Sequence, residues 1–286
     1  MLKKLLRRIL RQSGYDIVRL DPPPADAPVA PDGGAARLLA SNLNLDERLG
    51  YDLEDEAVSA IHVVRQNTML AKRRLVTLYE QVAYCERNAI PGAFVECGVW
   101  KAGAVGLMAI ANLRRSPRRR PLHLFDAFDD ICEPDAAVDG DRAVREAREL
   151  SGSTEPAGRL QALPGFYDRV GGHGTLGEAR HLLEQAIGYD PAFLHYHVGW
   201  FQETLPQVHE EIGPIALLRL DGDWYASTMV CLEHLYDKVV PGGIVILDDY
   251  GAYEGCRRAV DEYLARRDAR PYLSPVDSDC RYFIKS

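Results

Sequence analysis

Two short apolar stretches that each end in acidic residues are the strongest constraint on the fold of this chain. Residues 215–220 are followed by Asp221-Gly222-Asp223, and residues 243–247 are followed by Asp248-Asp249. Apolar stretches of this length are typical of buried strands. In open α/β sheets ligands bind beyond the carboxyl ends of the strands. The acids therefore predict a site for a hard cation with oxygen ligands; the alternative is a polar turn after each strand.

The sequence after residue 91 alternates between strand-like and helix-like segments. The expected strands are 93–97, 121–126, 193–198, 215–220 and 243–248, with a final edge strand over 282–285. The expected helices lie near 102–114, 175–187, 204–211, 227–238 and 254–267. This alternation predicts an α/β fold with a doubly wound, mostly parallel sheet and helices on both faces.

The chain before residue 91 divides into three expected regions. Residues 1–20 contain a basic amphipathic helix, in which residues 2–11 could lie on an anionic membrane surface, pack on a partner or stay mobile. Residues 21–36 are a Pro-rich linker. Residues 37–90 form a helical lid or cap region, with short helical pieces at best up to residue 66 and an amphipathic helix over 68–87. Residues 91–286 form the main domain.

Composition excludes several classes of protein. The net charge of −8 argues against general nucleic-acid binding. The six cysteines have no CxxC or metal-finger spacing, so we expect buried, reduced thiols in a cytoplasmic protein. Because no apolar stretch reaches the ~20 residues needed to cross a bilayer, any membrane contact would be peripheral, at the inner membrane face.

The first two expected strands carry the features of a nucleoside site. Gly98 lies where the first strand must turn sharply into a helix, and Glu96 precedes it by two residues. An acid at this position suits a ligand with a positively charged amino-acid end. Asp126 closes the second strand, where a carboxylate can accept hydrogen bonds from both ribose hydroxyls. Glu96 and Asp126 together predict S-adenosyl-L-methionine as the ligand.

Five stretches of the sequence resemble one enzyme family. They are IPGAFVECGVWKAG, HLFDAF, VGWFQETLP, LRLDGDWYAST and PGGIVILDDYGAYEGCRRAVDEY. They are similar to the macrocin O-methyltransferase (TylF/MycF-type) family, whose members include enzymes that methylate sugar hydroxyls on antibiotics. The resemblance covers roughly residue 66 to the C-terminus. It implies a Rossmann-like class I methyltransferase that uses S-adenosyl-L-methionine and Mg²⁺ or another divalent cation.

The resemblance also implies roles for particular residues. The metal ligands fall on Asp221, Asp248 and Asp249, and Asp221 is also the expected general base. The methyl-donor pocket falls on Glu96, Gly98 and Asp126, with Gly199-Trp200 near the adenine. A homodimer or higher homo-oligomer is expected. The chain departs from the family pattern at three places: Ala102, Ala226 and Asp129-Asp130-Ile131. Because these places are expected near the donor and the acceptor, they bear on the identity of the acceptor more than on the reaction.

The expected function is metal-dependent O-methylation of a sugar hydroxyl, on a glycosylated natural product or a cell-surface glycan. The alternatives are a non-catalytic binding or scaffold protein and a nicotinamide-dependent sugar oxidoreductase, although the chain lacks the G-x-G-x-x-G turn of the latter.

Several polar residues keep two interpretations. Asp223 could hold the acceptor or cap a helix. His195 and His197 could bind a metal or simply end a strand. The loop around His173 could cover the site or be an ordinary surface loop. The aromatic residues beside the strand ends could line an acceptor pocket or belong to the core: Trp200, Phe201, Trp224 and Tyr250.

Overall fold

The computed structural model describes residues 43–286. The expected basic helix at 1–20 and the linker at 21–36 lie outside the described residues, so they stay predictions. The strands are β1 (Ala93–Cys97), β2 (Leu122–Asp126), β3 (Leu194–Val198), β4 (Ile215–Leu220), β5 (Val239–Leu247), β6 (Ser274–Pro275) and β7 (Arg281–Ile284). The helices are α3 (Glu54–Val64), α4 (Lys72–Arg87), α5 (Gly103–Arg115), α6 (Gly140–Ser151), α7 (Leu176–Arg180), α8 (Phe201–Val208), α9 (Tyr225–Leu235) and α10 (Glu254–Arg266).

The strands form a seven-stranded sheet in the order β3-β2-β1-β4-β5-β7-β6. The first five strands are parallel, and β7 pairs antiparallel with β5 and β6. The predicted doubly wound, mostly parallel sheet is therefore confirmed. The strand expected at 282–285 is found as β7, but it is not the edge strand, because the short strand β6 pairs with its other side. The central strands β1 and β4 are buried along their whole length, as expected for strands with helices on both faces.

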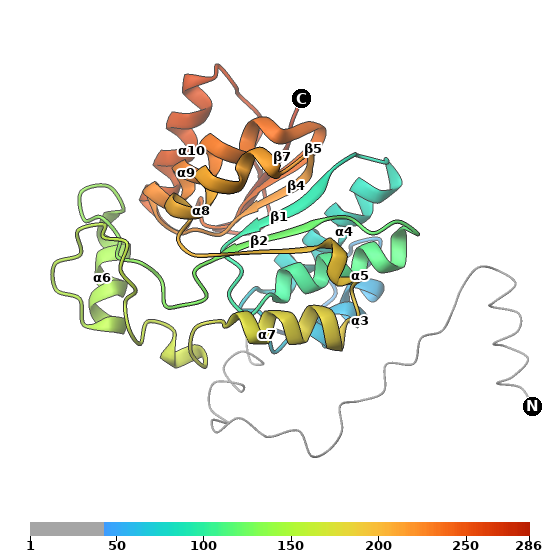
Figure 1. The fold of residues 1–286 in the computed structure, drawn as a ribbon, viewed down its shortest axis with the longest axis horizontal. Helices are drawn as coiled ribbons and strands as arrows, with labels where there is room; N and C mark the ends of the chain where they lie inside the picture. The colour runs from blue at the N-terminus through green and yellow to red at the C-terminus, as the bar shows by residue number, and fades with distance from the viewer. Residues whose placement is uncertain (1–42) are drawn as a thin grey trace, which may run out of the picture. The chain divides into compact units, whose positions relative to one another are not determined.

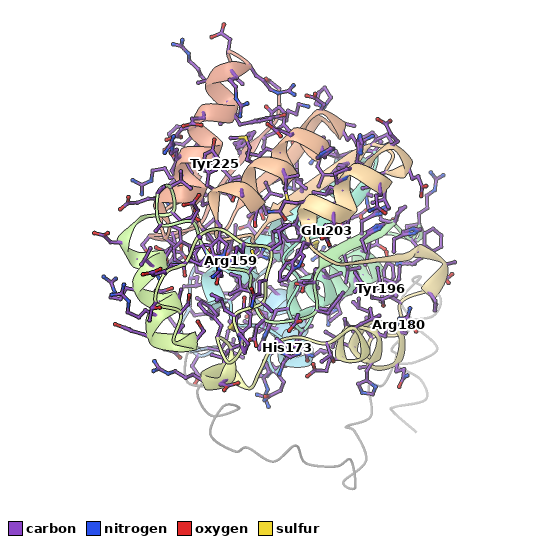
Figure 2. The ribbon with its side chains drawn as sticks, turned by 60° about the vertical axis from the view of Figure 1, so that its left-hand side comes forward. Arg159, His173, Arg180, Tyr196, Glu203 and Tyr225 are labelled. Atoms are coloured by element: carbon purple, nitrogen blue, oxygen red, sulfur yellow. The ribbon has the colours of Figure 1, made fainter. Side chains whose placement is uncertain are left out.

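Two groups of helices cover the two faces of the sheet (Figure 1). Helices α3, α4, α5 and α7 contribute to one hydrophobic core, and α8, α9 and α10 contribute to the other. At the edge of the sheet, Arg180 of α7 stacks over the ring of Tyr196 of β3 at 5.2 Å, and Figure 2 shows the two side chains. All six cysteines are buried and free, as predicted. Within residues 43–286, no helix is long and apolar enough to span a bilayer.

The register of the parallel strands determines where the acids lie. Cys97 at the end of β1 is paired with Leu220 at the end of β4, and Leu220 is paired with Leu247 at the end of β5. Asp221 and Asp248 each follow one of these residues, so both strands deliver their acids to the same edge of the sheet.

Three helical predictions were wrong in detail. Residues 37–66 contain α3, an eleven-residue helix; the Glu54 carboxylate in its first turn accepts the backbone N–H groups of Leu49 and Gly50 and pairs with Lys72 at 2.8 Å, a tertiary contact that no local pattern reveals. Helix α4 begins at Lys72 rather than at residue 68, because the Thr68 hydroxyl accepts the N–H of Leu70 and forms a turn first.

Helix α6 was not predicted at all. Its buried residues are only Ala143 and Ala147, and the rest of the segment is largely charged. Two small side chains do not make an apolar stripe that is recognisable in a sequence. Towards the C-terminus of the α7 segment, residues His181–Ala186 widen into a π-helix, so the helix expected at 175–187 exists but is not regular α-helix throughout.

Candidate active site

A cavity of about 520 Å³ opens at the carboxyl ends of the parallel strands. It is lined by residues in or after the last residues of five strands, by residues 67–70 before α4, and by Phe166, Tyr167, Arg169 and Val170. Every residue that the sequence predicted for the site lines this one cavity: Glu96, Gly98, Asp126, Gly199, Trp200, Asp221, Asp248 and Asp249. The structure therefore brings the expected donor-binding and metal-binding residues together, although it tests none of their roles.

The turn after β1 requires a glycine. Gly98 has a φ of +90°, and a Cβ atom there would lie 1.8 Å from the carbonyl oxygen of Asp221. Backbone hydrogen bonds hold the turn in place: the N–H of Gly98 donates to Phe125 and the N–H of Asp221 donates to Cys97. The turns after β1 and β4 are thus packed directly against each other, which places Glu96 and Asp221 close together.

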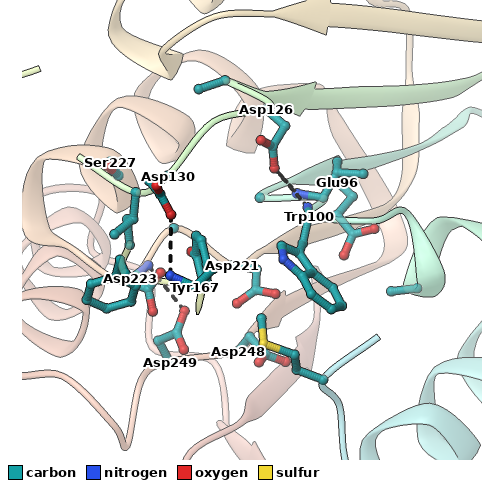
Figure 3. Close-up of a pocket in the computed structure, with 18 of the residues that line it drawn as sticks. Glu96, Trp100, Asp126, Asp130, Tyr167, Asp221, Asp223, Ser227, Asp248 and Asp249 are labelled. Carbon is teal, nitrogen blue, oxygen red and sulfur yellow. Dashed lines mark hydrogen bonds between the residues drawn. The ribbon is translucent and has the colours of Figure 1, made fainter. Parts of the chain in front are cut away.

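The Asp126 carboxylate holds the same turn from the other side. Its Oδ2 accepts the N–H groups of Val99 at 2.6 Å and Trp100 at 2.9 Å, and its Oδ1 accepts the N–H of Phe128 (Figure 3). Burial raises the pKa of Asp126, and these hydrogen bonds oppose that rise. Asp126 therefore orders the loop after β1, and a hydrogen bond to a ribose would be an additional role.

Three acids converge on the floor of the cavity. One carboxylate oxygen from each of Asp221, Asp248 and Asp249 lies within 4.8 Å of the others, and Asp248 and Asp249 are buried. Burial, together with nearby carboxylates, raises the pKa of Asp221 and of Asp249. A set of oxygen donors alone is the chemistry that Mg²⁺, Mn²⁺ and Ca²⁺ prefer. These residues fit a divalent cation.

A fourth acid, Asp223, lies beside these three. Its backbone has a φ of +56°, and its N–H donates to Asp249 at 3.2 Å. Burial and the charges of Asp221 and Asp248 raise its pKa well above the usual value. Helix α9 has no side-chain N-cap, so the interpretation of Asp223 as a cap is wrong, and the residue lines the cavity instead.

Two arginines in the cavity were not predicted. Arg219 of β4 is only 2% exposed and pairs with Glu96, with Asp221 at 2.8 Å and with Asp248 at 2.7 Å. Arg74 of α4 pairs with the other oxygen of Asp248 at 2.6 Å. A charged residue inside the apolar stretch 215–220 was the available signal for Arg219. No local pattern distinguishes Arg74 from the other basic residues of its helix.

A segment between β2 and α7 lies over the cavity. We call this segment, residues 127–175, the cap; it is distinct from residues 37–90, which the sequence predicted to be a lid. Buried Asp130 accepts the N–H groups of Gly165 at 3.0 Å and Tyr167 at 3.3 Å, and Figure 3 shows the ring of Tyr167 pointing into the cavity. Burial and the surrounding acids, Asp223 first, raise the pKa of Tyr167 well above its usual value. The Trp100 indole donates to the carbonyl of Gly172 at 3.1 Å, which ties the cap to the turn after β1.

The sequence left two interpretations for the aromatic residues beside the strand ends and for His195 and His197, and their positions in the structure distinguish them. Trp200 and Phe201 line the cavity, whereas Trp224 is a core residue and Tyr250 does not line the cavity. His195 and His197 stack on or beside the ring of His123, and they do not belong to the convergent groups of three ligands found among residues 43–286. The second such group is Asp129, Asp130 and His173 in the cap.

Comparison with known proteins gives a consistent result. The model of the macrocin O-methyltransferase (TylF) family matches residues 43–155 and 184–285. Demethyldecarbamoylnovobiocin O-methyltransferase of Streptomyces niveus is 34% identical over 223 residues, which cover 77% of this chain and 76% of that protein. Mycinamicin III 3''-O-methyltransferase of Micromonospora griseorubida is 30% identical over 224 residues, which cover 77% and 79%.

The solved structure of the O-methyltransferase NovP has a TM-score of 0.62 to this chain at 32% identity, covering 77% of this chain and 82% of NovP. The resemblance inferred from the sequence motifs is therefore confirmed, and so is the Rossmann-like class I methyltransferase fold. The chain belongs to the macrocin O-methyltransferase (TylF) family and is an O-methyltransferase.

Proposed function

We propose that this chain transfers a methyl group from S-adenosyl-L-methionine to a sugar hydroxyl and that the reaction depends on a divalent cation. The observation that carries the proposal is the convergence of Asp221, Asp248 and Asp249 on the floor of the cavity that also contains Glu96 and Asp126. The acceptor is a sugar of a glycosylated natural product or of a cell-surface glycan. A relative from Streptomyces olivaceus, 31% identical over 211 residues, is named as the 4'-O-methyltransferase of a rhamnosyl-tetracenomycin, which supports a glycosylated small molecule.

The donor would bind along the turns after β1, β2 and β3. Glu96 has one carboxylate oxygen paired with Arg219, whereas its Oε2 is buried and has no hydrogen-bond partner in the structure. An unpaired buried oxygen is costly unless a ligand satisfies it, and the ammonium of the donor's amino-acid end has the right charge. Asp126 would receive the ribose, and Gly199-Trp200 would contact the adenine. The sulfonium of the donor supplies an activated methyl group.

The cation would be held by Asp221, Asp248 and Asp249. When bound, it would lower the pKa of an acceptor hydroxyl and restrict its orientation. Asp221 is the proposed general base, because its side chain is 29% exposed whereas that of Asp248 is 4% exposed, so its carboxylate is accessible to an acceptor in the cavity. Asp248 and Asp249 are buried in the cavity floor, and residues of the cap line the opposite wall.

Three further parts of the proposal lie outside the contacts described above. The protein is proposed to be cytoplasmic and to form a homodimer or a higher homo-oligomer. Residues 2–11 are proposed to allow peripheral contact with a membrane, and they lie outside the described residues. The choice of metal among Mg²⁺, Mn²⁺ and Ca²⁺ depends on coordination geometry.

Calorimetric titration of the full chain with S-adenosylhomocysteine in the presence of Mg²⁺, with NAD⁺ as the control, tests the donor. We expect micromolar binding of S-adenosylhomocysteine alone. Binding of NAD⁺ alone would favour the oxidoreductase alternative, and binding of neither would contradict the proposed donor. Methyl transfer to a panel of glycosides, with and without EDTA, then tests the acceptor class and the dependence on metal. Tight donor binding with no transfer to any glycoside would favour the scaffold alternative.

A further inference from the structure

Arg219 is surrounded by acids from three adjacent strands. Its guanidinium pairs with Glu96 of β1, with Asp221 directly after β4 and with Asp248 directly after β5. The sheet register explains the contact with Glu96, because Glu96 and Arg219 are paired residues of neighbouring parallel strands. One side chain therefore contacts both the proposed donor-binding acid and two of the three proposed metal ligands.

This arrangement has an electrostatic reason. Buried carboxylates of like charge cannot all stay ionised and close together without a counter-charge. A guanidinium is permanently charged and presents several N–H groups in a rigid plane, so it can hold more than one carboxylate at a defined angle. At Arg219 the Nη1 group donates hydrogen bonds to Glu96 and to Asp221, whereas the Nη2 group forms an ion pair with Asp248 at 2.7 Å without hydrogen-bond geometry.

Arg74 provides a contrast within the same cavity. It pairs with Asp248 at 2.6 Å, with Asp277 at 2.6 Å and with Asp279 at 3.3 Å, and it makes no ion pair with Glu96. The two arginines thus share one metal-site acid, but only Arg219 also reaches the donor side.

We propose that Arg219 is a positioning residue that organises the donor site and the metal site together. It keeps Glu96 oriented with one oxygen left for the donor, and it keeps Asp221 and Asp248 converged for the cation. This inference rests on the proposed function. It predicts that a change at Arg219 weakens two binding equilibria at once, whereas a change at Arg74 weakens only one.

The experiment measures two dissociation constants by calorimetry on the full chain: that of S-adenosylhomocysteine in EDTA, and that of Mg²⁺ without S-adenosylhomocysteine. For Arg219→Met we expect both constants to rise by at least about tenfold, because Glu96, Asp221 and Asp248 lose the side chain that orients them and the crowded acids then take up protons that the ligands must displace. For Arg219→Lys we expect partial recovery of both, because one ammonium has the charge but not the planar geometry that reaches three carboxylates. Arg74→Met is the matched control, and we expect it to raise the constant for Mg²⁺ alone.

Thermal unfolding of each variant separates positioning from a purely structural role. A lower unfolding midpoint with both dissociation constants unchanged in Arg219→Lys would overturn the inference, and so would a change confined to one ligand. If Arg219→Met does not fold, Arg219→Lys decides the question, because it keeps the buried charge. A wild-type chain that binds neither S-adenosylhomocysteine nor Mg²⁺ would contradict the proposed function itself, whereas normal wild-type binding with an unaffected Arg219→Lys variant would contradict only this inference.

Discussion

The acid-bearing strand ends and the cap face each other across one cavity, but they are built in different ways. The strand ends are Glu96, Asp126, Asp221, Asp248 and Asp249, placed by the register of a buried parallel sheet. The cap, residues 127–175, is held mainly by hydrogen bonds between loops, such as those that Asp130 accepts from Gly165 and Tyr167. Figure 1 shows α6 and the neighbouring loops gathered beside the ends of the strands.

The family comparison divides the cap itself, because residues 127–155 are matched by the family model and residues 156–175 are not. The family model matches all the strands whose ends carry the acids, but it leaves residues 156–183 unmatched. This unmatched segment contributes Phe166, Tyr167, Arg169 and Val170 to the cavity. The strands and the first part of the cap are thus matched by the family model, whereas the unmatched segment belongs to the later part of the cap and to α7. We expect the strand ends to hold the donor and the cation as proposed, and the unmatched part of the cap to contact the acceptor.

The largest effect should follow a change at the strand ends. Asp248→Asn keeps the shape of a buried residue but removes the charge that the cation needs. We expect methyl transfer to fall by at least about 10²-fold, while S-adenosylhomocysteine binding stays nearly unchanged. A single-turnover assay at saturating Mg²⁺, together with calorimetry, checks both parts.

Asp268→Asn is the matched control, because the side chain of Asp268 is largely exposed and distant in sequence from the acids of the cavity. This variant should keep full activity. Normal turnover by Asp248→Asn would contradict the proposed metal site, because the reaction would then not need the carboxylate of Asp248.

Two glycines with similar backbone conformations allow the packing of the turn after β1 to be compared with that of the cap. Gly98 and Gly172 have φ values of +90° and +81°, but an added Cβ atom would strike the carbonyl of Asp221 at Gly98 and would meet nothing within 4 Å at Gly172. Gly98→Ala should therefore lower the free energy of unfolding by roughly 3 kcal/mol or more, and Gly172→Ala by only about 1 kcal/mol. Chemical denaturation measures both values. Equal losses would show that backbone strain alone matters and that the packing between the turns after β1 and β4 does not.

The two regions also differ in how far they could be predicted from the sequence. The sheet and the acids at its edge were predicted because each acid lies in, or immediately after, the last residues of an apolar stretch that forms a strand. Arg219 was missed because two of its three partners, Glu96 and Asp248, belong to neighbouring strands, and one charged residue in an apolar stretch does not identify them. Tyr167 was missed because loop hydrogen bonds rather than a periodic pattern direct it into the cavity. Helix α6 buries only two alanines and so left no apolar stripe.

Smaller effects are expected in the cap. Tyr167→Ala removes an aromatic side chain that points into the cavity beside the acids, so we expect the KM for a glycoside acceptor to rise about tenfold. The dissociation constant of S-adenosylhomocysteine should stay the same, because the donor is proposed to bind along the strand ends. Tyr167→Phe separates the contribution of the hydroxyl from that of the ring. Tyr272→Ala is the control, since that side chain is 81% exposed and lies outside the cavity lining. A loss of donor affinity in Tyr167→Ala would mean that the cap and the strand ends are not separate in function.

The smallest effect concerns the pH dependence of the sheet itself. Burial, together with the neighbouring His195 and His197, lowers the pKa of His123 to about 3. A folded-state pKa below the unfolded value of ~6.5 means that the unfolded state binds more protons, so stability is full above pH 6.5 and falls as the pH drops below it. His123 alone should cost about 1 kcal/mol of stability at pH 5.5.

Thermal unfolding between pH 7.5 and 5.0 should therefore depend less on pH in His123→Gln than in the wild type. His181→Gln, a change at an exposed histidine of the π-helical segment, should leave the dependence unchanged. An identical pH dependence of unfolding in His123→Gln and the wild type would show that this histidine is not kept neutral in the folded sheet.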